Sequence, residues 1–143
     1  MPMTLDDIGE WLLHLSARGQ DDITFLLCVP YAERKTLPRD QYGLYVVCDL
    51  WRTVLYVGMT TTSFWQRWNE GMGHHMRDWL DEEVRHGVDL YIHYMPCVAP
   101  DMVLRWMELT WIALLKPAYN AESNPGSKAR RAQRLRHLDL RIT

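Results

Sequence analysis

Cysteine is scarce in this sequence and follows no metal-binding pattern. Cys28, Cys48 and Cys97 are widely separated, odd in number and in no CxxC spacing. This arrangement argues against a disulfide framework or a zinc ribbon and favours a reducing compartment. We therefore expect a cytoplasmic protein.

Long hydrophobic runs are also missing. No apolar stretch approaches the ~18–20 residues that a transmembrane helix needs. The first residues, Met1 to Asp7, lack the basic region and the apolar run of a signal peptide. The sequence therefore predicts no membrane partner.

Positive charge is scarce over most of the chain. Residues 1–125 hold ten Lys and Arg against seventeen Asp and Glu, a net charge of −7, and residues 126–143 hold six against one, a net charge of +5. The acidic body argues mildly against tight non-specific DNA binding by the body alone. A solvated basic end and a contact with the phosphate backbone are the two interpretations of the tail. Its basic residues are Lys128, Arg130, Arg131, Arg134, Arg136 and Arg141.

What is present suits one domain of 143 residues with a sizeable core. Residues 1–40 are predicted to form an extension packed on the core, with an amphipathic helix from Thr4 to Arg18 and a strand-like run from Ile23 to Val29. Residues 41–123 form the predicted core, and residues 124–143 the basic tail.

The core alternates strand and helix patterns. Tyr42–Val47, Val54–Gly58 and Asp89–Met95 are predicted strands, because they are rich in β-branched and aromatic residues or alternate apolar and polar. Helices are predicted from Ser63, a suitable N-cap, from His75 to His86, and from Pro100 to Leu115. The fold class is α/β (α+β): a small, mainly antiparallel three-stranded sheet flanked by helices, with an extra N-terminal helix.

Two tyrosines lie in the paired strands beside small residues. Alternation puts Tyr45 on one face with Gly43 and Val47, and Tyr56 on one face with Val54 and Gly58. We expect room there for a ligand to approach backbone and phenol together. Ordinary strand aromatics are the alternative interpretation.

Glu108 is an unusual residue for its position. Its helix neighbours include Leu104, Trp111 and Ile112, so an unpaired carboxylate would be costly there. A bound Mg²⁺ would resolve the cost, since it prefers hard oxygen ligands. An ion pair with Arg105, three residues earlier, is the alternative, and spacing alone does not decide between them.

Five elements in order resemble the GIY-YIG nuclease family. They are Gly43-Leu44-Tyr45, Tyr56-Val57-Gly58, Arg67, Glu108 and the segment Lys116-Pro117-Ala118-Tyr119-Asn120, and the resemblance covers roughly residues 41–121. It implies that Glu108 binds the metal, that Arg67 holds the phosphate, and that Tyr45 and Tyr56 flank it. We expect Tyr45 to act as the base and Gly43, Gly58 and Asn120 to have structural roles, Asn120 by bonding backbone groups. Without the resemblance, a solvent-directed arginine is the commoner interpretation of Arg67.

Two departures from the family pattern concern the general base. Met59 stands where lysine is frequent in the related repair nucleases, and Gly71 stands where many members carry histidine or tyrosine. His74 and His75 follow closely and are candidate substitutes, although adjacent histidines are more often plain surface residues.

The resulting prediction is a DNA endonuclease that uses Mg²⁺ or Mn²⁺ and leaves 5′-phosphate and 3′-hydroxyl ends. Single- and double-stranded DNA both remain candidate substrates, RNA is not excluded, and a homodimer would suit double-strand cleavage. The alternative is a catalytically silent nucleic-acid-binding or protein-interaction module with the nuclease fold. The nuclease prediction requires that four side chains converge on one region: Tyr45, Tyr56, Arg67 and Glu108.

Overall fold

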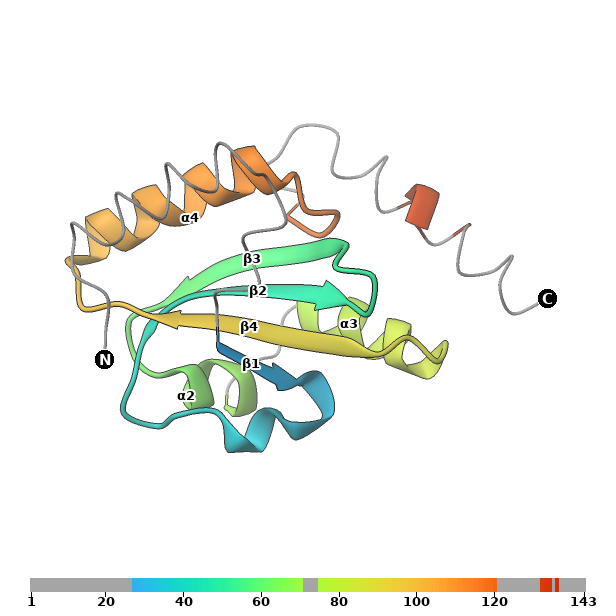
Figure 1. Cartoon of the computed structure of the whole chain (residues 1–143), viewed down its shortest axis with the longest axis horizontal. Coiled ribbons are helices and arrows are strands. Elements are labelled where there is room, and N and C mark those ends of the chain that lie inside the picture. Colours follow the sequence, from blue (N-terminus) through green and yellow to red (C-terminus); the bar gives the residue numbers. More distant parts are fainter. Residues whose placement is uncertain (1–26, 71–74, 121–131, 135, 137–143) are drawn as a thin grey trace.

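The structure is a computed structural model of the chain, and it describes residues 27–70, 75–120, 132–134 and 136 (Figure 1). The helix expected between Thr4 and Arg18 therefore lies outside the described residues. In chain order the elements are β1 (Leu27–Pro30), the 3-10 helix η2 (Tyr31–Thr36), β2 (Gly43–Asp49), β3 (Val54–Thr60), α2 (Phe64–Asn69), α3 (His75–Arg85), β4 (Leu90–Pro96) and α4 (Asp101–Leu115).

The fold is α+β, built on a four-stranded antiparallel sheet in the order β1-β4-β2-β3. The prediction of three strands is wrong in its count. The strand-like run before Pro30, assigned from sequence to the N-terminal extension, contributes β1, which pairs with β4. Alternation within a run of residues indicates a strand but does not say which strand it will pair with, and this is why β1 was left out of the predicted sheet.

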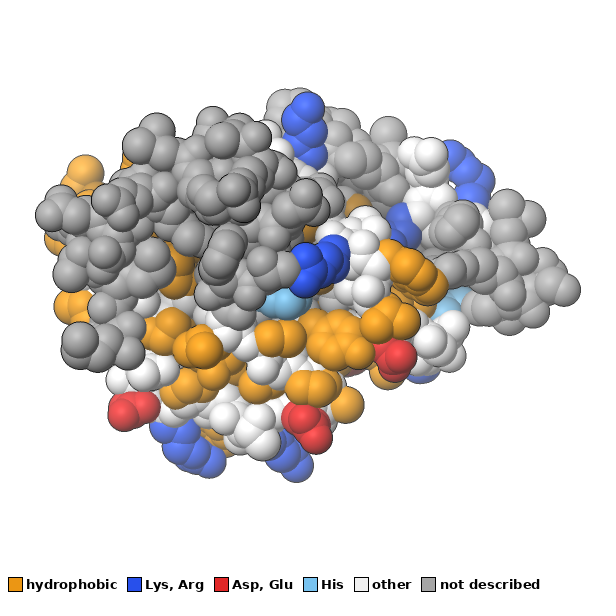
Figure 2. Space-filling view, in the orientation of Figure 1, with side chains coloured by type: hydrophobic (Ala, Val, Ile, Leu, Met, Phe, Trp, Pro, Cys, Tyr) orange, Lys and Arg blue, Asp and Glu red, His pale blue; other side chains and the backbone are white. Residues whose placement is uncertain are grey.

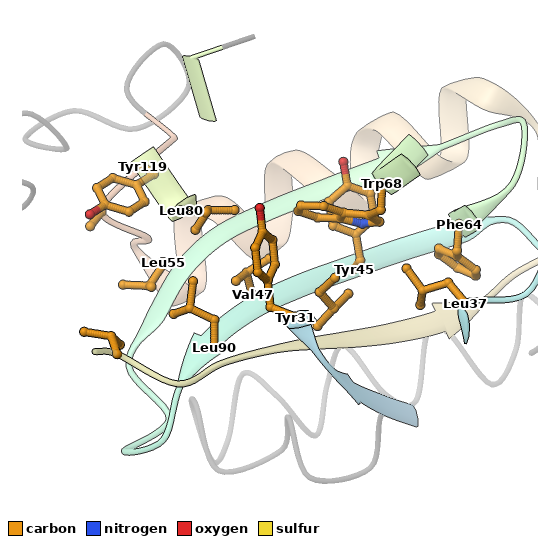
Figure 3. Packing of buried hydrophobic residues seen from close by; sticks show 13 residues of the cluster. Tyr31, Leu37, Tyr45, Val47, Leu55, Phe64, Trp68, Leu80, Leu90 and Tyr119 are labelled. Carbon is orange, nitrogen blue, oxygen red and sulfur yellow. The ribbon is translucent and has the colours of Figure 1, made fainter. Parts of the chain in front are cut away.

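Hydrophobic clusters cover both faces of the sheet. On one face α4 packs over β2 and β3, with Leu104, Met107 and Ile112 buried against Val46 and Val57. On the other face lie η2, α2 and α3 (Figure 1), and their buried side chains pack together there (Figure 3). None of the helices in the described part of the chain is long and apolar enough to cross a membrane.

The helix boundaries follow local chemistry. Ser63 caps α2, because its Oγ accepts a hydrogen bond of 3.0 Å from the Gln66 backbone N–H. Arg67 therefore lies in the short helix that the sequence predicts. At the other end of the core, α4 stops at Lys116, which adopts a left-handed conformation (φ 50°) immediately before Pro117.

A β-bulge changes which residues share a face in the β2–β3 hairpin. Tyr45 lies opposite Gly58 and Val47 lies opposite Tyr56, but the register shifts between Val47 and Cys48, so that Cys48 lies opposite Val54. Tyr45 and Tyr56 consequently share one face of the sheet, whereas Val54 packs on the α4 face. The expectation that Tyr56 and Val54 share a face is wrong, because simple alternation does not hold across a bulge.

Candidate functional site

Tyr45 is the most deeply buried of the predicted site residues, with none of its surface exposed. Its ring lies across Gly58: a Cβ at that position would be 2.5 Å from the phenol oxygen and 2.6 Å from Cζ. The Trp68 ring meets the Tyr45 ring edge-on, with centroids 5.1 Å apart (Figure 3). Gly58 is thus needed to accommodate the tyrosine itself, and the room expected for a ligand beside it is filled.

Gly43 is required for a different structural reason. Its φ is 150°, and an added Cβ would collide with the Met95 carbonyl oxygen and lie 2.8 Å from the Cys97 backbone nitrogen. The Cys97 N–H also donates a 2.9 Å hydrogen bond to the Tyr42 carbonyl. Glycine therefore lets β2 begin in close contact with the end of β4.

Arg67 connects α2 to the tyrosines. Its Nε donates a hydrogen bond of 3.0 Å to the Tyr45 hydroxyl, and its side chain is half-buried. Tyr56 is also half-buried, and its ring centroid lies 6.0 Å from that of Tyr45. Burial lowers the pKa of Arg67, but the oxygens of Tyr45 and Tyr56 outweigh it and raise the pKa overall, so the guanidinium is charged at any physiological pH.

The protonation of Tyr45 bears on its expected role as the base. Burial, and then the neighbouring Tyr56, raise its pKa well above the usual range, although Arg67 acts in the opposite direction. Tyr45 is thus a neutral phenol at neutral pH. The hydrogen bond of Tyr45 to Arg67 suits a role in orienting the guanidinium rather than in accepting a proton from water.

Glu108 lies on α4 and is almost fully buried, with 7% of its surface exposed. Arg105 donates a hydrogen bond to it through Nη1, as the alternative interpretation from spacing anticipated. Burial raises the pKa of Glu108, while Arg105, the Met59 backbone N–H and Arg67 each lower it, and burial is the larger effect. The carboxylate is thus stabilised from outside its own helix by the backbone of β3 and, to a smaller extent, by the charge of Arg67.

The outer rim of β3 is where the predicted residues meet. The helices α2 and α4 pack on opposite faces of the sheet, and β3 is an edge strand. The Met59 N–H on β3 and the charge of Arg67 both lower the pKa of Glu108, Arg67 having the smaller effect, so the influence of Arg67 acts across this edge. Glu108 also affects the pKa of Tyr45. Tyr45, Tyr56 and Arg67 are thus in contact with one another, and Glu108, on the helix that packs on the other face, is close enough for its charge to affect Tyr45.

The segment that follows α4 occupies the same rim. The Asn120 side chain accepts a 2.9 Å hydrogen bond from the Val57 N–H and donates one of 2.8 Å to the Val57 carbonyl oxygen. One residue earlier, the Tyr119 N–H donates a 2.8 Å hydrogen bond to the Leu55 carbonyl. These bonds fix the part of β3 that carries Tyr56, and they are the kind of backbone contact expected of Asn120.

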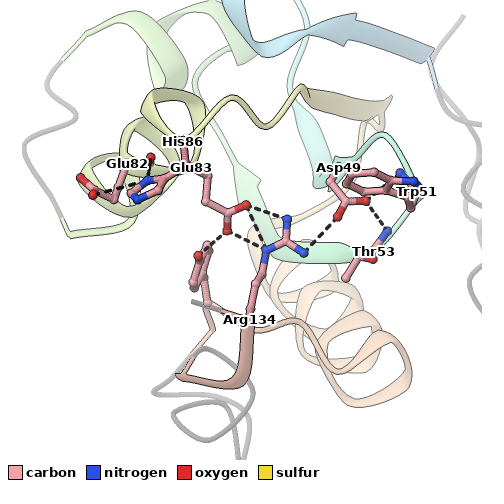
Figure 4. Close-up of polar contacts among 8 residues, drawn as sticks. Asp49, Trp51, Thr53, Glu82, Glu83, His86 and Arg134 are labelled. Atoms are coloured by element: carbon pink, nitrogen blue, oxygen red, sulfur yellow. Dashed lines mark hydrogen bonds and ion pairs between the residues drawn. The ribbon is translucent and has the colours of Figure 1, made fainter. Parts of the chain in front are cut away.

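The tail residue Arg134 lies elsewhere, in a buried ion-pair network (Figure 4). Its Nη2 is 2.6 Å from Glu83 Oε1 and its Nη1 is 3.0 Å from Asp49 Oδ2. Glu83 has no exposed surface and also accepts a hydrogen bond from the Tyr119 hydroxyl. Arg134 is therefore committed to carboxylates rather than available to a phosphate. The sequence gives no local signal for this network, because Glu83 and Arg134 lie 51 residues apart.

The other predicted auxiliary residues add little. His74, Lys128, Arg130, Arg131 and Arg141 lie outside the described residues, His75 begins α3, and Arg136 is exposed. On the face shown in Figure 2, the described lysines and arginines are scattered rather than gathered into one basic patch. The described surface thus offers no large electrostatic footprint for nucleic acid on this face.

A divalent metal would have one protein carboxylate at this site. Among the described residues, no group of three or more His, Cys, Asp or Glu side chains could hold a metal ion. Mg²⁺, however, keeps several waters and is commonly bound through one or two carboxylates. Glu108, a buried carboxylate whose charge acts on Tyr45, could supply the single carboxylate of that type of site.

Comparison with known proteins assigns no relative. No protein-family model, curated protein or solved structure matches the chain.

Proposed function

We propose that this protein is a divalent-metal-dependent endonuclease that hydrolyses phosphodiester bonds in DNA through a GIY-YIG-type site. The observation that carries the proposal is the contact of two phenols and a guanidinium beside β3, with the buried carboxylate of Glu108 close enough for its charge to affect the pKa of Tyr45. They come from β2, β3, α2 and α4, so nothing local in the sequence requires them to meet.

Arg67 is the phosphate-binding residue in this proposal. Tyr45 holds its Nε, which fixes the plane of the guanidinium before substrate arrives. The remaining N–H donors of that plane suit paired hydrogen bonds to a phosphate whose negative charge grows in the transition state. A fixed donor needs no reorganisation during the reaction, and this is what makes such groups effective.

The two tyrosines have different tasks. Tyr45 is buried and neutral, so it orients Arg67. Tyr56 is partly exposed beside it and is the phenol that aligns the attacking water. The rise in the pKa of Tyr45 favours this division over the use of Tyr45 as the base.

Glu108 is the residue that would hold Mg²⁺ or Mn²⁺. When bound, the metal polarises a phosphoryl oxygen and stabilises the leaving 3′ oxygen, which leads to 5′-phosphate and 3′-hydroxyl products. The carboxylate lies on α4, and the Met59 N–H on β3 stabilises its charged form.

The test is cleavage of supercoiled plasmid, single-stranded DNA and RNA with Mg²⁺ or Mn²⁺. Arg67→Ala and Glu108→Ala should each reduce the rate about 10²–10³-fold, the usual cost of losing a group that stabilises transition-state charge. The controls are Arg85→Ala and Glu82→Ala, which break an exposed ion pair with the same three-residue spacing on α3. Cleavage that persists in both site variants would contradict the assignment of this site.

A binding module without turnover is the second candidate, and a specific observation favours it. Met102, Trp106 and Leu109 on α4 are 85%, 58% and 42% exposed, and such apolar side chains are typical of protein contacts. Intact substrate from the wild type with every metal tested would support this candidate over the nuclease.

A further inference from the structure

The ion pair between Arg105 and Glu108 is unequal in its exposure. The Glu108 side chain is 9% exposed, whereas that of Arg105 is 59% exposed. A buried carboxylate needs a compensating positive charge, because burial without one is costly. Arg105 supplies this positive charge from a side chain that lies mostly in solvent.

The pair on α3 provides a comparison within the same molecule. Glu82 and Arg85 have the same three-residue spacing, but their side chains are 45% and 65% exposed. A pair of that kind contributes little and its carboxylate is adequately solvated by water. The Arg105 pair differs because its acid is removed from water and its charged form is stabilised by the Met59 backbone.

A metal ion and the Arg105 guanidinium compete for the Glu108 carboxylate, and binding both at once is unfavourable. Arg105 already occupies the Oε1 atom of Glu108. A divalent ion on this carboxylate would compete for that atom or face a positive charge a few ångströms away, which is repulsive even in a well-screened site. Since Arg105 is exposed, its movement into solvent is the easiest way to relieve the conflict.

We propose that Arg105 stands in for the metal at Glu108 and is displaced when a divalent cation binds. This inference rests on the proposed function, because it needs Glu108 to be the metal ligand. Arg105 is then a positioning residue: it neutralises and aims the carboxylate in the metal-free protein, and by competing it weakens the affinity for the metal. Once displaced, it adds a positive charge beside the site, where substrate phosphate would approach.

The experiment measures binding of Mn²⁺ alone, without nucleic acid, by the electron paramagnetic resonance signal of the free ion and by calorimetry. The proteins are the wild type, Arg105→Ala, Arg105→Gln, Glu108→Gln and the matched control Arg85→Ala. Removing the competing side chain should lower the Kd for Mn²⁺ about two- to fivefold, the size expected for loss of one partly exposed ion pair. Arg85→Ala should bind like the wild type, and Glu108→Gln should lose this binding.

A second measurement reports on the folded state. Because a ligand stabilises the form it binds, Mn²⁺ should raise the Tm of Arg105→Ala more than that of the wild type at the same concentration. The circular dichroism spectrum of each variant without metal confirms that it is folded. Arg105→Gln guards against an effect of side-chain truncation, because it keeps a similar length without the charge.

The outcomes separate the two levels of the proposal. Equal affinity in the wild type and both Arg105 variants, with binding lost in Glu108→Gln, would overturn the role of Arg105 and leave the metal site intact. Binding that Glu108→Gln retains, or no binding in any protein, would overturn the metal assignment and with it the proposed function. The displacement is supported only if Mn²⁺ binds more tightly to both Arg105 variants than to the wild type.

Discussion

Glu83 and Glu108 are both helix carboxylates buried against the sheet and paired with arginine, yet their surroundings are opposite in kind. Glu83 accepts hydrogen bonds from Nε and Nη2 of Arg134 (Figure 4). The Arg134 side chain is only 11% exposed and also pairs with Asp49. Glu108 is paired with an arginine that is mostly in solvent. The first arrangement is closed, and the second can exchange its partner.

The difference teaches that burial of a carboxylate does not by itself mark a functional site. Around Glu83 the charges are mutually satisfied, and such networks cost several kcal/mol to break, on the order of 3–5 when one partner is removed. At Glu108 burial outweighs the stabilising neighbours, since its pKa is raised. A carboxylate whose compensation is incomplete and whose partner lies mostly in solvent is the better candidate for binding a cation.

The largest expected effect comes from opening the closed network. Arg134→Ala leaves Glu83 and Asp49 as buried carboxylates without their shared arginine, so we expect the free energy of unfolding to fall by about 3–5 kcal/mol. Urea denaturation measures it. Arg136→Ala, an exposed neighbour on the same segment, is the control and should change stability by less than about 0.5 kcal/mol. Equal losses in the two variants would mean that the network contributes little.

The candidate site can be disturbed through Gly58. In Gly58→Ala the new Cβ meets the Tyr45 ring, so we expect a loss of about 1–3 kcal/mol from overpacking, together with reduced cleavage as the bond to Arg67 is displaced. Gly87→Ala is the control: no atom lies within 4 Å of its Cβ, and only its φ of 83° opposes the substitution. That variant should lose stability but keep its cleavage rate. Full activity in Gly58→Ala would separate Tyr45 from the reaction.

A third change reduces the charge in the closed network. Glu83→Gln keeps the shape but replaces charge-assisted hydrogen bonds with neutral ones, which are weaker by about 1 kcal/mol. We expect a loss of stability of this order at pH 7 in thermal or urea unfolding. Unchanged stability would place the Arg134 contribution in packing rather than in charge.

The smallest effect should have the opposite sign, at Glu108. Its folded-state pKa is raised above the unfolded value, so the folded state binds the proton more tightly and stability falls as pH rises through the interval between the two values. Glu108→Gln resembles the protonated form, and we expect it to be slightly more stable than wild type at pH 7 and no more stable below the unfolded pKa.

Glu82 is the control for that prediction. Arg85 lowers the pKa of the exposed Glu82 carboxyl, so its contribution to stability is present above the unfolded pKa and lost as pH falls through the lower folded one. Glu82→Gln should therefore be slightly less stable than wild type at pH 7. Unfolding curves recorded from pH 7 to pH 3 measure both variants, and the same sign for both would show that burial does not dominate at Glu108.

Much of the core was predictable because its signals are local. The strands around Tyr45, Tyr56 and Ile92, the cap at Ser63 and the end of α4 before Pro117 all follow from patterns a few residues long. The same holds for the pair of Arg105 with Glu108, which lie three residues apart on one helix.

What could not be predicted depends on distant contacts. The pairing of β1 with β4 and the bulge after Val47 are decided between strands, not within them. The placement of Arg134 against Glu83 joins two residues that lie 51 positions apart in the chain. Likewise, the buried state of Tyr45 comes from Trp68 and Gly58 on two other elements, so its pKa could not be read from its own strand.

The hydrogen bonds of Asn120 and Tyr119 to β3 have a consequence for solubility. An uncovered edge strand is a template on which another chain can add a strand, the first step of many aggregates. Here the polar groups of Leu55 and Val57 are already satisfied by the chain's own following segment. Substitutions at Asn120 should thus lower the solubility of the protein before they lower its activity.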